Sequence, residues 1–415
     1  MTLEARGRDT KIAYMMSRFP KLTETFVLDE MLEMQRQGVA VEVFPLWRER
    51  AQVIHPDALP LVARAHFLPL LNLEILRDLI YWLVRSPRKL LQALATLIRE
   101  NCRSVRFLAG SLVIFPKACT MAKRMEIAGV SHIHAHFASH PAAAALVIGR
   151  LTGLTWSFTA HGSDLHREQA MLGQKVREAS FVVTISDYNR RFILDRLGSQ
   201  QESKIRVVHC GVDADSFKIQ PVHSAALEIV CIGTLHEVKG QRYLLEACAK
   251  LTTRGVQWHC HLIGDGPDRE QLIALVGKLG IPDRVTFHGA CDREQVRRLL
   301  AGMNLACAPS VPTSDGRREG IPVALIEAAA CGLPLVASRL SGIPELVLDN
   351  QTGMLTEPGD SEDIARVLEI LARDPSTRKR LGEAAAANVR ENFSLQVSVT
   401  TLRRLIRDRC VTCPE

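Results

Sequence analysis

SDGRREGIPVALIEAAACGLPLVAS, residues 314–338, is the stretch of sequence that decides the fold. Glu319 lies there in a polar loop, and Glu327 follows eight residues later. Pro322 suits the first position of a helix, where its missing N–H is no loss. We therefore expect a helix from Pro322 to about Ala330, ended by the Gly-Leu-Pro that follows, and then a buried strand.

The loop before this helix is suited to an anionic ligand that also carries hydroxyls. Free amides and the positive end of the helix dipole attract anions. Glu319 lies at the mouth of the helix and Glu327 about two turns in, so both need a partner other than the anion. Ribose or sugar hydroxyls are natural partners. A capped amphipathic helix with a charged first turn remains the alternative from these residues alone.

Predicted strands alternate with helices in two series along the chain. The first series lies at 11–17, 39–46, 131–138, 155–162, 180–186 and 205–211. The second lies at 228–234, 258–264, 285–289, 303–310, 333–338 and 353–358. This alternation predicts an α/β protein with two doubly wound parallel sheets, whose ligands bind beyond the carboxyl ends of the strands. Two such sheets facing each other would put the active site in the cleft between them.

The stretch around Glu319 and Glu327 resembles the E-x7-E signature of retaining glycosyltransferases of family 4, which have the GT-B fold. The segments IVCIGTLHEVKGQRYLLEA, HLIGDGPDREQL, TFHGAC and PELVLDNQTGMLTEPGD are similar to further landmarks of that family, in order. FTAHGSDL and VHCGVDADSF match in the N-terminal half. The opening segment, YMMSRFPKLTETFVLDEMLEMQRQGVAVEVFPL, resembles the subgroup that builds bacterial exopolysaccharides, including colanic-acid-type enzymes.

This resemblance implies three parts of the chain. Residues 1–215 are the acceptor-binding domain, with a helical insertion at about 68–128. Residues 216–390 are the nucleotide-sugar-binding domain, and 391–415 form a helical tail that packs back on the N-terminal domain. The polar stretch 212–226, which contains Pro221, reads as the linker. A dinucleotide fingerprint is not supported, because Gly264-Asp265-Gly266 lacks the third glycine.

The resemblance also implies the donor site. The donor is a nucleoside-diphosphate sugar and no cofactor is needed. Glu327 is expected to bond the ribose, and Glu319 with His161 to address the sugar. The diphosphate is expected to lie against Lys239, Gly233 and the amides near Gly320, Ile321, Pro322 and Val323. The family usually carries an Arg where this chain has Thr234, and Arg317 or Arg318 is the candidate replacement.

The acceptor side is expected in the loop after the first strand. Many family members carry a Gly-Gly pair there, and Thr23, Glu24 and Thr25 replace it. Thr23 capping a helix with Glu24 in its first turn is the alternative, and both roles are compatible. His136 at a strand end lines the cleft in this interpretation, and Asp164 steadies the loop that holds His161.

We expect no metal ion in the enzyme. His132, His134 and His136 share one face of a strand, but no carboxylate or cysteine lies near them at ligand spacing. The D-x-D pattern of Asp213 and Asp215 falls at the linker, so we treat it as coincidence. Cys410-x-x-Cys413 has no second pair.

Composition is that of a soluble globular protein, with 47% hydrophobic and 23% charged residues. Aromatic residues make up 5%, which argues against nucleic-acid binding. Eleven scattered cysteines suit the reducing cytoplasm. The opening MTLEARGRDT is polar and unlike a signal peptide. The apolar run at 67–84 is interrupted by charges, and the run at 105–115 is too short to span a membrane.

Charge is concentrated between Leu68 and Glu126, where ten basic and four acidic residues leave +6 of the chain's +7. Tyr81, Trp82 and Phe107 are interleaved with the charges. This pattern predicts peripheral contact with an anionic membrane, on the inner face of the cell membrane. The alternative is a helical insertion packed on its own domain, with a solvated basic face.

The expected function is transfer of a sugar from a nucleoside-diphosphate sugar to a lipid-linked saccharide in cell-surface polysaccharide synthesis, with the anomeric configuration retained. A nucleotide-sugar epimerase or a phosphorylase on the same scaffold is the enzymatic alternative, although no lysine has the context of a cofactor-bearing residue. A carbohydrate-binding assembly factor is the non-catalytic one. The sequence does not distinguish the sugar, the base (uridine or guanosine) or the acceptor.

Overall fold

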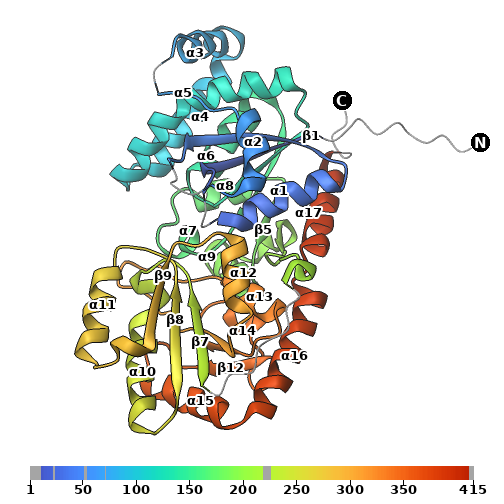
Figure 1. Cartoon of the computed structure of the whole chain (residues 1–415). Coiled ribbons are helices and arrows are strands. Elements are labelled where there is room, and N and C mark those ends of the chain that lie inside the picture. The colour runs from blue at the N-terminus through green and yellow to red at the C-terminus, as the bar shows by residue number, and fades with distance from the viewer. Residues whose placement is uncertain (1–10, 22–23, 51–53, 71, 218–225, 411–415) are drawn as a thin grey trace, which may run out of the picture. The chain divides into compact units, whose positions relative to one another are not determined.

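The computed structural model describes residues 11–21, 24–50, 54–70, 72–217 and 226–410, and Figure 1 shows the chain. Contacts divide it into two compact units. Unit 1 comprises Met1–Val208 with Val399–Glu415, and unit 2 comprises His209–Ser398. Each unit holds one six-stranded parallel sheet, so the predicted α/β architecture is confirmed.

Unit 1 is built on a sheet with the strand order β2-β1-β3-β4-β5-β6. Its strands are β1 (Lys11–Phe19), β2 (Ala40–Arg48), β3 (His132–His136), β4 (Thr155–Ala160), β5 (Phe181–Thr184) and β6 (Ile205–Val207). Its helices are α1 (Thr25–Arg36), α2 (Leu59–Arg64), α3 (Leu73–Arg85), α4 (Pro87–Asn101), α5 (Val105–Ala128), α6 (His140–Thr152), α7 (Ser163–His166), α8 (Leu172–Glu178) and α9 (Asp187–Leu197). The order reverses between β1 and β3, and ligands bind at such a point, beyond the strand ends.

Burial on both faces explains the composition of these strands. Residues 12–16 of β1 are at most 1% exposed, as expected for a central parallel strand. Helix α6 carries a run of alanines and lies against the sheet with all of residues 141–148 buried. A Cβ on Gly149 would come within 2.7 Å of the Trp156 ring, so only glycine allows this close approach of helix and strand.

Unit 2 has the strand order β12-β11-β10-β7-β8-β9. Its strands are β7 (Leu227–Ile232), β8 (Trp258–Ile263), β9 (Val285–Gly289), β10 (Leu305–Ala308), β11 (Leu335–Ser338) and β12 (Gly353–Thr356). Its helices are α10 (Gln241–Thr253), α11 (Arg269–Lys278), α12 (Arg293–Leu300), α13 (Val323–Ala330), α14 (Ile343–Leu346), α15 (Ser361–Arg373) and α16 (Pro375–Asn392). Here the order reverses between β7 and β10, which marks the ligand-binding edge of this sheet.

The last helix, α17 (Leu395–Cys410), starts in unit 2 and ends in unit 1. Within unit 1, Arg403 donates a hydrogen bond to the carbonyl of Gln37 at 2.8 Å. The predicted linker at 212–226 begins inside unit 2, because Val212 bridges to Ser394. Residues 218–225, which include Pro221, lie outside the described part of the chain.

The helical insertion expected at 68–128 consists of α3, α4 and α5. The prediction that the apolar run at 105–115 is too short was wrong, because α5 continues through Pro116 for 24 residues. Among the described residues, α5 alone is long and apolar enough to cross a membrane, and 56% of that apolar window is buried within the protein. Burial of this kind is typical of a core helix, so α5 does not indicate a membrane span.

Candidate functional site

The ligand-binding edge of unit 2 brings together three polar side chains from two loops. Lys239 follows β7, whereas Ser310 and Glu319 follow β10. Lys239 Nζ lies 2.7 Å from Glu319 Oε1, and Ser310 donates its hydroxyl hydrogen to Glu319 Oε2 at 3.1 Å. These three residues line a pocket with the ends of β7 and β10 and with Pro322, Ala324 and Leu325. The pocket therefore lies where the strand order reverses.

The loop that carries Lys239 is held rigidly. The ring of His236 accepts a hydrogen bond from the amide of Val238, and Val238 in turn accepts one from the amide of Val311. Gly240 has a φ of +66°, and a Cβ there would meet the carbonyl oxygen of Pro309 at 1.9 Å. A side chain at residue 240 would thus force the two loops apart and move Lys239.

Gly233 gives the lysine its place against the strand end. A Cβ on Gly233 would lie 3.0 Å from Lys239 Cε and 3.3 Å from its Nζ. The lysine side chain therefore lies over the backbone of Gly233, with its ammonium group at the pocket. Lys239 and Glu319 keep 21% and 15% of their side chains exposed, so a ligand can reach both.

Helix α13 points its N-terminus at the same pocket. The first helical hydrogen bond runs from the amide of Leu325 to the carbonyl of Pro322, which leaves the amides of Val323 and Ala324 without helical acceptors. Pro322 was predicted to be the first residue of the helix, and this was wrong, because it is the residue before the helix. Glu327 is half-buried and is the fifth helical residue, so it lies about one turn in rather than two.

The two arginines proposed to replace the family's missing cation differ in their surroundings. Arg317 Nη1 lies 3.0 Å from His236 Nε2, and its Nε pairs with Asp315 at 3.1 Å. Arg317 thus braces the loop that carries Lys239, whereas Arg318 is exposed. Thr234 contributes its backbone carbonyl, which accepts a hydrogen bond from the Gln241 side chain at 3.1 Å.

His161 lies at the corresponding edge of unit 1, directly after β4. It is 8% exposed, and burial together with neighbouring histidines lowers its pKa well below the ordinary value, so the ring is neutral near pH 7. Asp164 holds the loop in place by accepting hydrogen bonds from the amides of Ala138, His161 and Gly162 at 2.7, 3.1 and 2.7 Å. Burial nevertheless raises the pKa of the Asp164 carboxyl above its ordinary value.

Histidines on β3 and hydroxyls on β4 form an alternating ladder across the two strands. His132 bonds Thr155 and Ser157, and His134 bonds Ser157 and Thr159, all at 2.7–2.9 Å. Burial lowers the pKa of both His132 and His134 to about 3, so both rings are neutral. At the strand end, His136 Nδ1 lies 3.1 Å from His161 Nε2, so His136 reaches the predicted sugar-contacting residue.

Sequence reasoning missed Glu30, which α1 brings to this ladder from more than a hundred residues away. Its Oε1 lies 3.3 Å from His136 Nε2 and 3.8 Å from His134 Nε2, and the Tyr14 hydroxyl donates to it at 3.0 Å. Burial raises the pKa of Glu30, but the adjacent His136 and His134 outweigh burial and lower it overall. The statement that no carboxylate lies near these histidines was therefore wrong.

Glu30, His134 and His136 are also the cluster among the described residues that could hold a metal ion, with ligand atoms within 4.8 Å of one another. Hydrogen bonds already engage His134 Nε2 with Thr159 and Glu30 with Tyr14. In the D-x-D pattern, the Asp213 carboxylate accepts hydrogen bonds from the amide of Asp215 and the hydroxyl of Ser216, and these bonds close a local turn.

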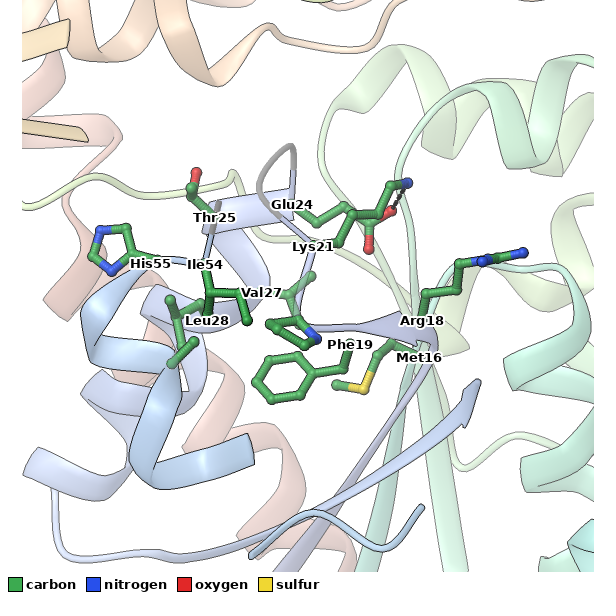
Figure 2. Close-up of a pocket in the computed structure, with 12 residues that line it drawn as sticks. Met16, Arg18, Phe19, Lys21, Glu24, Thr25, Val27, Leu28, Ile54 and His55 are labelled. Atoms are coloured by element: carbon green, nitrogen blue, oxygen red, sulfur yellow. Dashed lines mark hydrogen bonds and ion pairs between the residues drawn. The ribbon is translucent and has the colours of Figure 1, made fainter. Parts of the chain in front are cut away.

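The loop after β1 borders a second pocket, which is lined by the end of β1, the start of α1 and residues 54, 55 and 58 after β2 (Figure 2). Its floor is apolar and its rim is polar, with Arg18, Lys21, Glu24 and His55 among the lining residues. Glu24 pairs with Lys21 at 2.5 Å. Glu24 directly precedes α1 and Thr25 begins it, so the alternative with Glu24 in the first turn was wrong. Thr23 lies outside the described residues.

Two family models match the chain and together span residues 23–388. The model described as "Glycosyltransferase Family 4" matches residues 23–216, and the one described as "Glycosyl transferases group 1" matches 213–388. A relative from Escherichia coli (strain K12), WcaL, whose name assigns it to colanic acid biosynthesis as a glycosyltransferase, is 29% identical over 96% of this chain and 99% of its own. The amylovoran biosynthesis glycosyltransferase AmsK of Erwinia amylovora is 26% identical over 95% and 99%.

Solved structures share the fold. A glycosyltransferase from Rickettsia africae ESF-5 superposes with a TM-score of 0.71 at 16% identity, covering 98% of this chain and 100% of that one. HepE of Anabaena, solved with UDP-glucose, gives a TM-score of 0.71 at 18% identity, covering 96% and 99%. The two parallel sheets and these neighbours confirm the predicted GT-B fold.

Proposed function

The chain belongs to family 4 of the glycosyltransferases, a retaining family, and on that premise we propose that it transfers a sugar from a nucleoside-diphosphate sugar to a saccharide acceptor of an exopolysaccharide. One observation carries the donor assignment. Lys239, Glu319 and the N-terminus of α13 converge on one pocket, where the strand order of unit 2 reverses. A cation, free amides and a carboxylate are what a diphosphate linked to hydroxyl-bearing sugars requires.

In this proposal each group acts on one part of the donor. Lys239 and the amides of Val323 and Ala324 bind the diphosphate, and Glu327 accepts hydrogen bonds from the ribose hydroxyls. Negative charge develops on the departing diphosphate, and preorganised cations and amides stabilise it. Glu319 and His161 are the residues that we propose for the sugar. The leaving phosphate helps to remove the acceptor proton, as expected for retention without a protein nucleophile.

The acceptor assignment rests on the relatives and on unit 1. Both full-length relatives carry names from exopolysaccharide biosynthesis, and we propose a lipid-linked saccharide of that class as the acceptor. In this proposal Glu24, Thr25 and His136 contribute to its site, and the enzyme acts in the cytoplasm at the inner face of the membrane. HepE was solved in complex with UDP and with UDP-glucose, so uridine donors are the first to test.

Replacing Glu327 with Ala tests the donor site. The variant should stay folded and lose about 1.5–3 kcal/mol of nucleoside-diphosphate affinity, because a charged hydrogen-bond acceptor is removed. Isothermal titration calorimetry with UDP and GDP measures the loss. Glu369→Ala is the matched control, since Glu369 is also in unit 2 and pairs with Arg254 and Arg373 on the surface. Unchanged affinity in Glu327→Ala would refute the ribose assignment.

A further inference from the structure

Helix α3 has an apolar face that its own unit does not cover. Five aliphatic residues on it are half or more exposed: Leu73 (84%), Leu76 (56%), Ile80 (52%), Leu83 (50%) and Val84 (77%). With 3.6 residues per turn, all five fall within an arc of about 100°. Ile75, Asp78 and Trp82, which are buried, lie on the opposite side. The exposed aliphatic residues therefore form one continuous stripe, which we call the α3 stripe.

The opposite face of α3 is fixed to α5. Trp82 donates its ring N–H to the carbonyl of Cys119 at 2.8 Å, and buried Asp78 pairs with Lys123 at 2.8 Å. Arg124 holds Glu74 through two hydrogen bonds of 2.7 and 2.9 Å. Because α3 is anchored in this way, it cannot rotate the stripe inward without breaking these bonds. The exposure is a property of the folded unit.

Exposed aliphatic residues are concentrated in this part of the chain. Of the eighteen large exposed hydrophobic side chains among the described residues, eleven lie between residues 70 and 113. Leu91 and Ile98 lie two turns apart on one side of α4, and Val105, Leu112 and Val113 lie on the first half of α5. Figure 1 shows α3 at the edge of unit 1, above α4 and α5. Apolar surface of this density marks an interaction site.

The charges of the segment differ from the sequence-based expectation. Arg77, Arg85, Arg99, Lys123 and Arg124 each pair with an acidic residue of the same segment, and Lys117 is buried and donates to the carbonyl of Leu46. Four cations, Arg88, Lys89, Arg103 and Arg106, have no ion-pair partner among the described residues. Arg88 and Lys89 are exposed and begin α4 directly after the α3 stripe.

We propose that α3 and the first turn of α4 dock on the surface of an anionic lipid bilayer. The α3 stripe enters the boundary between headgroups and acyl chains, while Arg88 and Lys89 contact the anionic headgroups. Unpaired cations beside an exposed aliphatic stripe match the charge and polarity of such a surface. The docking does not depend on the identity of the donor or acceptor, and most of its strength comes from the stripe rather than from charge.

Vesicle flotation of the full-length protein tests the proposal. Wild type should bind vesicles of phosphatidylcholine with phosphatidylglycerol, and bind pure phosphatidylcholine measurably but more weakly. The stripe variant Leu76→Ser/Ile80→Ser/Leu83→Ser should lose about tenfold or more in partitioning to both. Arg88→Gln/Lys89→Gln should weaken binding to the anionic vesicles to the level of pure phosphatidylcholine, and leave binding to pure phosphatidylcholine unchanged. The matched control Ile273→Ser/Ile370→Ser/Val397→Ser replaces comparably exposed aliphatic residues of unit 2 and should bind like wild type.

Folding and self-association are followed in the same experiment. Trp82 is fully buried, so near-ultraviolet circular dichroism and denaturant titration show that the stripe variant keeps the packing of α3. A folded stripe variant that floats like wild type would overturn the proposal. So would a wild type that binds neither vesicle. A lipid-free dimer in analytical ultracentrifugation that only the stripe variant abolishes would assign the stripe to a second copy of the chain instead.

Discussion

Each unit contains one glutamate and two histidines arranged in a row. These two Glu-His-His groups have nearly the same geometry. In unit 1, Glu30 contacts His136 Nε2, and His136 Nδ1 lies 3.1 Å from His161 Nε2, with ring centroids 5.3 Å apart. In unit 2, Glu228 contacts His261 Nε2 at 3.0 Å, and His261 Nδ1 lies 3.0 Å from His288 Nε2, with centroids 5.2 Å apart. Local chemistry alone therefore does not separate them.

The two Glu-His-His groups differ in their position within the sheet. His136 and His161 lie at the carboxyl ends of β3 and β4, beside the point where the strand order reverses. Glu30 reaches His136 there from α1, and His136 is fully buried. Glu228, His261 and His288 cross β7, β8 and the edge strand β9, and all three are half-buried. In parallel α/β sheets ligands bind at the first kind of position. We therefore expect the group in unit 1 to take part in the reaction and the group in unit 2 to stabilise the sheet.

The largest expected difference in transfer rate follows from removing the last histidine of each Glu-His-His group. His161→Ala should lower the rate of sugar transfer by about 10²-fold or more, the scale for losing one preorganised contact to a transition state. His288→Ala should change it less than about threefold. Steady-state transfer to a saccharide acceptor measures both, with nucleoside-diphosphate affinity as the check that unit 2 is intact. Equal losses of transfer rate in the two variants would show that position in the sheet does not decide which histidine takes part in the reaction.

Acidification should weaken unit 1 before unit 2. Burial lowers the pKa of His132 and His134 to about 3, so both stay neutral when folded but bind protons when unfolded. Their stabilising effect is complete above the unfolded value of about 6.5 and is lost as the pH falls toward 3. The slope is about 1.4 kcal/mol per histidine per pH unit below about 6.5. Amide exchange protection at pH 7 and pH 5, compared between the units, measures it.

Glu30→Gln and Glu228→Gln compare the carboxylates. Glutamine keeps the shape but removes the charge that orients His136, and through it His161. We expect transfer by Glu30→Gln to fall about tenfold in kcat, which equals about 1.4 kcal/mol, with the donor KM unchanged. Glu228→Gln should stay near wild type. A Glu30→Gln enzyme with wild-type kcat would leave Glu30 as a packing residue only.

Chelation should have the smallest effect. Glu30, His134 and His136 have ligand atoms close enough for a metal, but His134 Nε2 is already bonded to Thr159 and Glu30 already accepts from the Tyr14 hydroxyl. Among the three, only His136 Nε2 has no hydrogen-bond partner in the described part of the chain. We expect transfer to survive dialysis against EDTA unchanged. Loss of activity in EDTA that manganese or magnesium restores would refute this, and loss restored by zinc and absent in Glu30→Gln would assign the metal to this cluster.

Much of the fold and of the candidate donor site was predictable from local sequence. The strands are short apolar runs with clear ends, and Glu319, Glu327 and Lys239 lie in loops whose spacing is itself the signal. The meeting of Lys239 with Glu319 required only that β7 and β10 be neighbours. That neighbourhood follows from the doubly wound order.

The approach of Glu30 to His136 was not predictable in this way. It depends on how α1 is rotated against the sheet, and an isolated glutamate on an amphipathic helix carries no mark of that rotation. Charge counting failed on the helical insertion for a similar reason. The partners of Asp78 and Glu74 lie 45 and 50 residues away, so the sequence counted paired and unpaired cations alike.

Helix α3 combines buried acidic residues with an exposed aliphatic stripe. Its acidic residues Glu74 and Asp78 face its own unit and are held by Arg124 and Lys123, while the five aliphatic residues of the α3 stripe face outward. In buffer without lipid or detergent, such a helix should promote self-association of the protein. Preparations should become turbid or form soluble oligomers as the protein concentration rises. A mild detergent should reverse this, because it offers the stripe an alternative cover. Purification behaviour would then report on the helix before any vesicle is prepared.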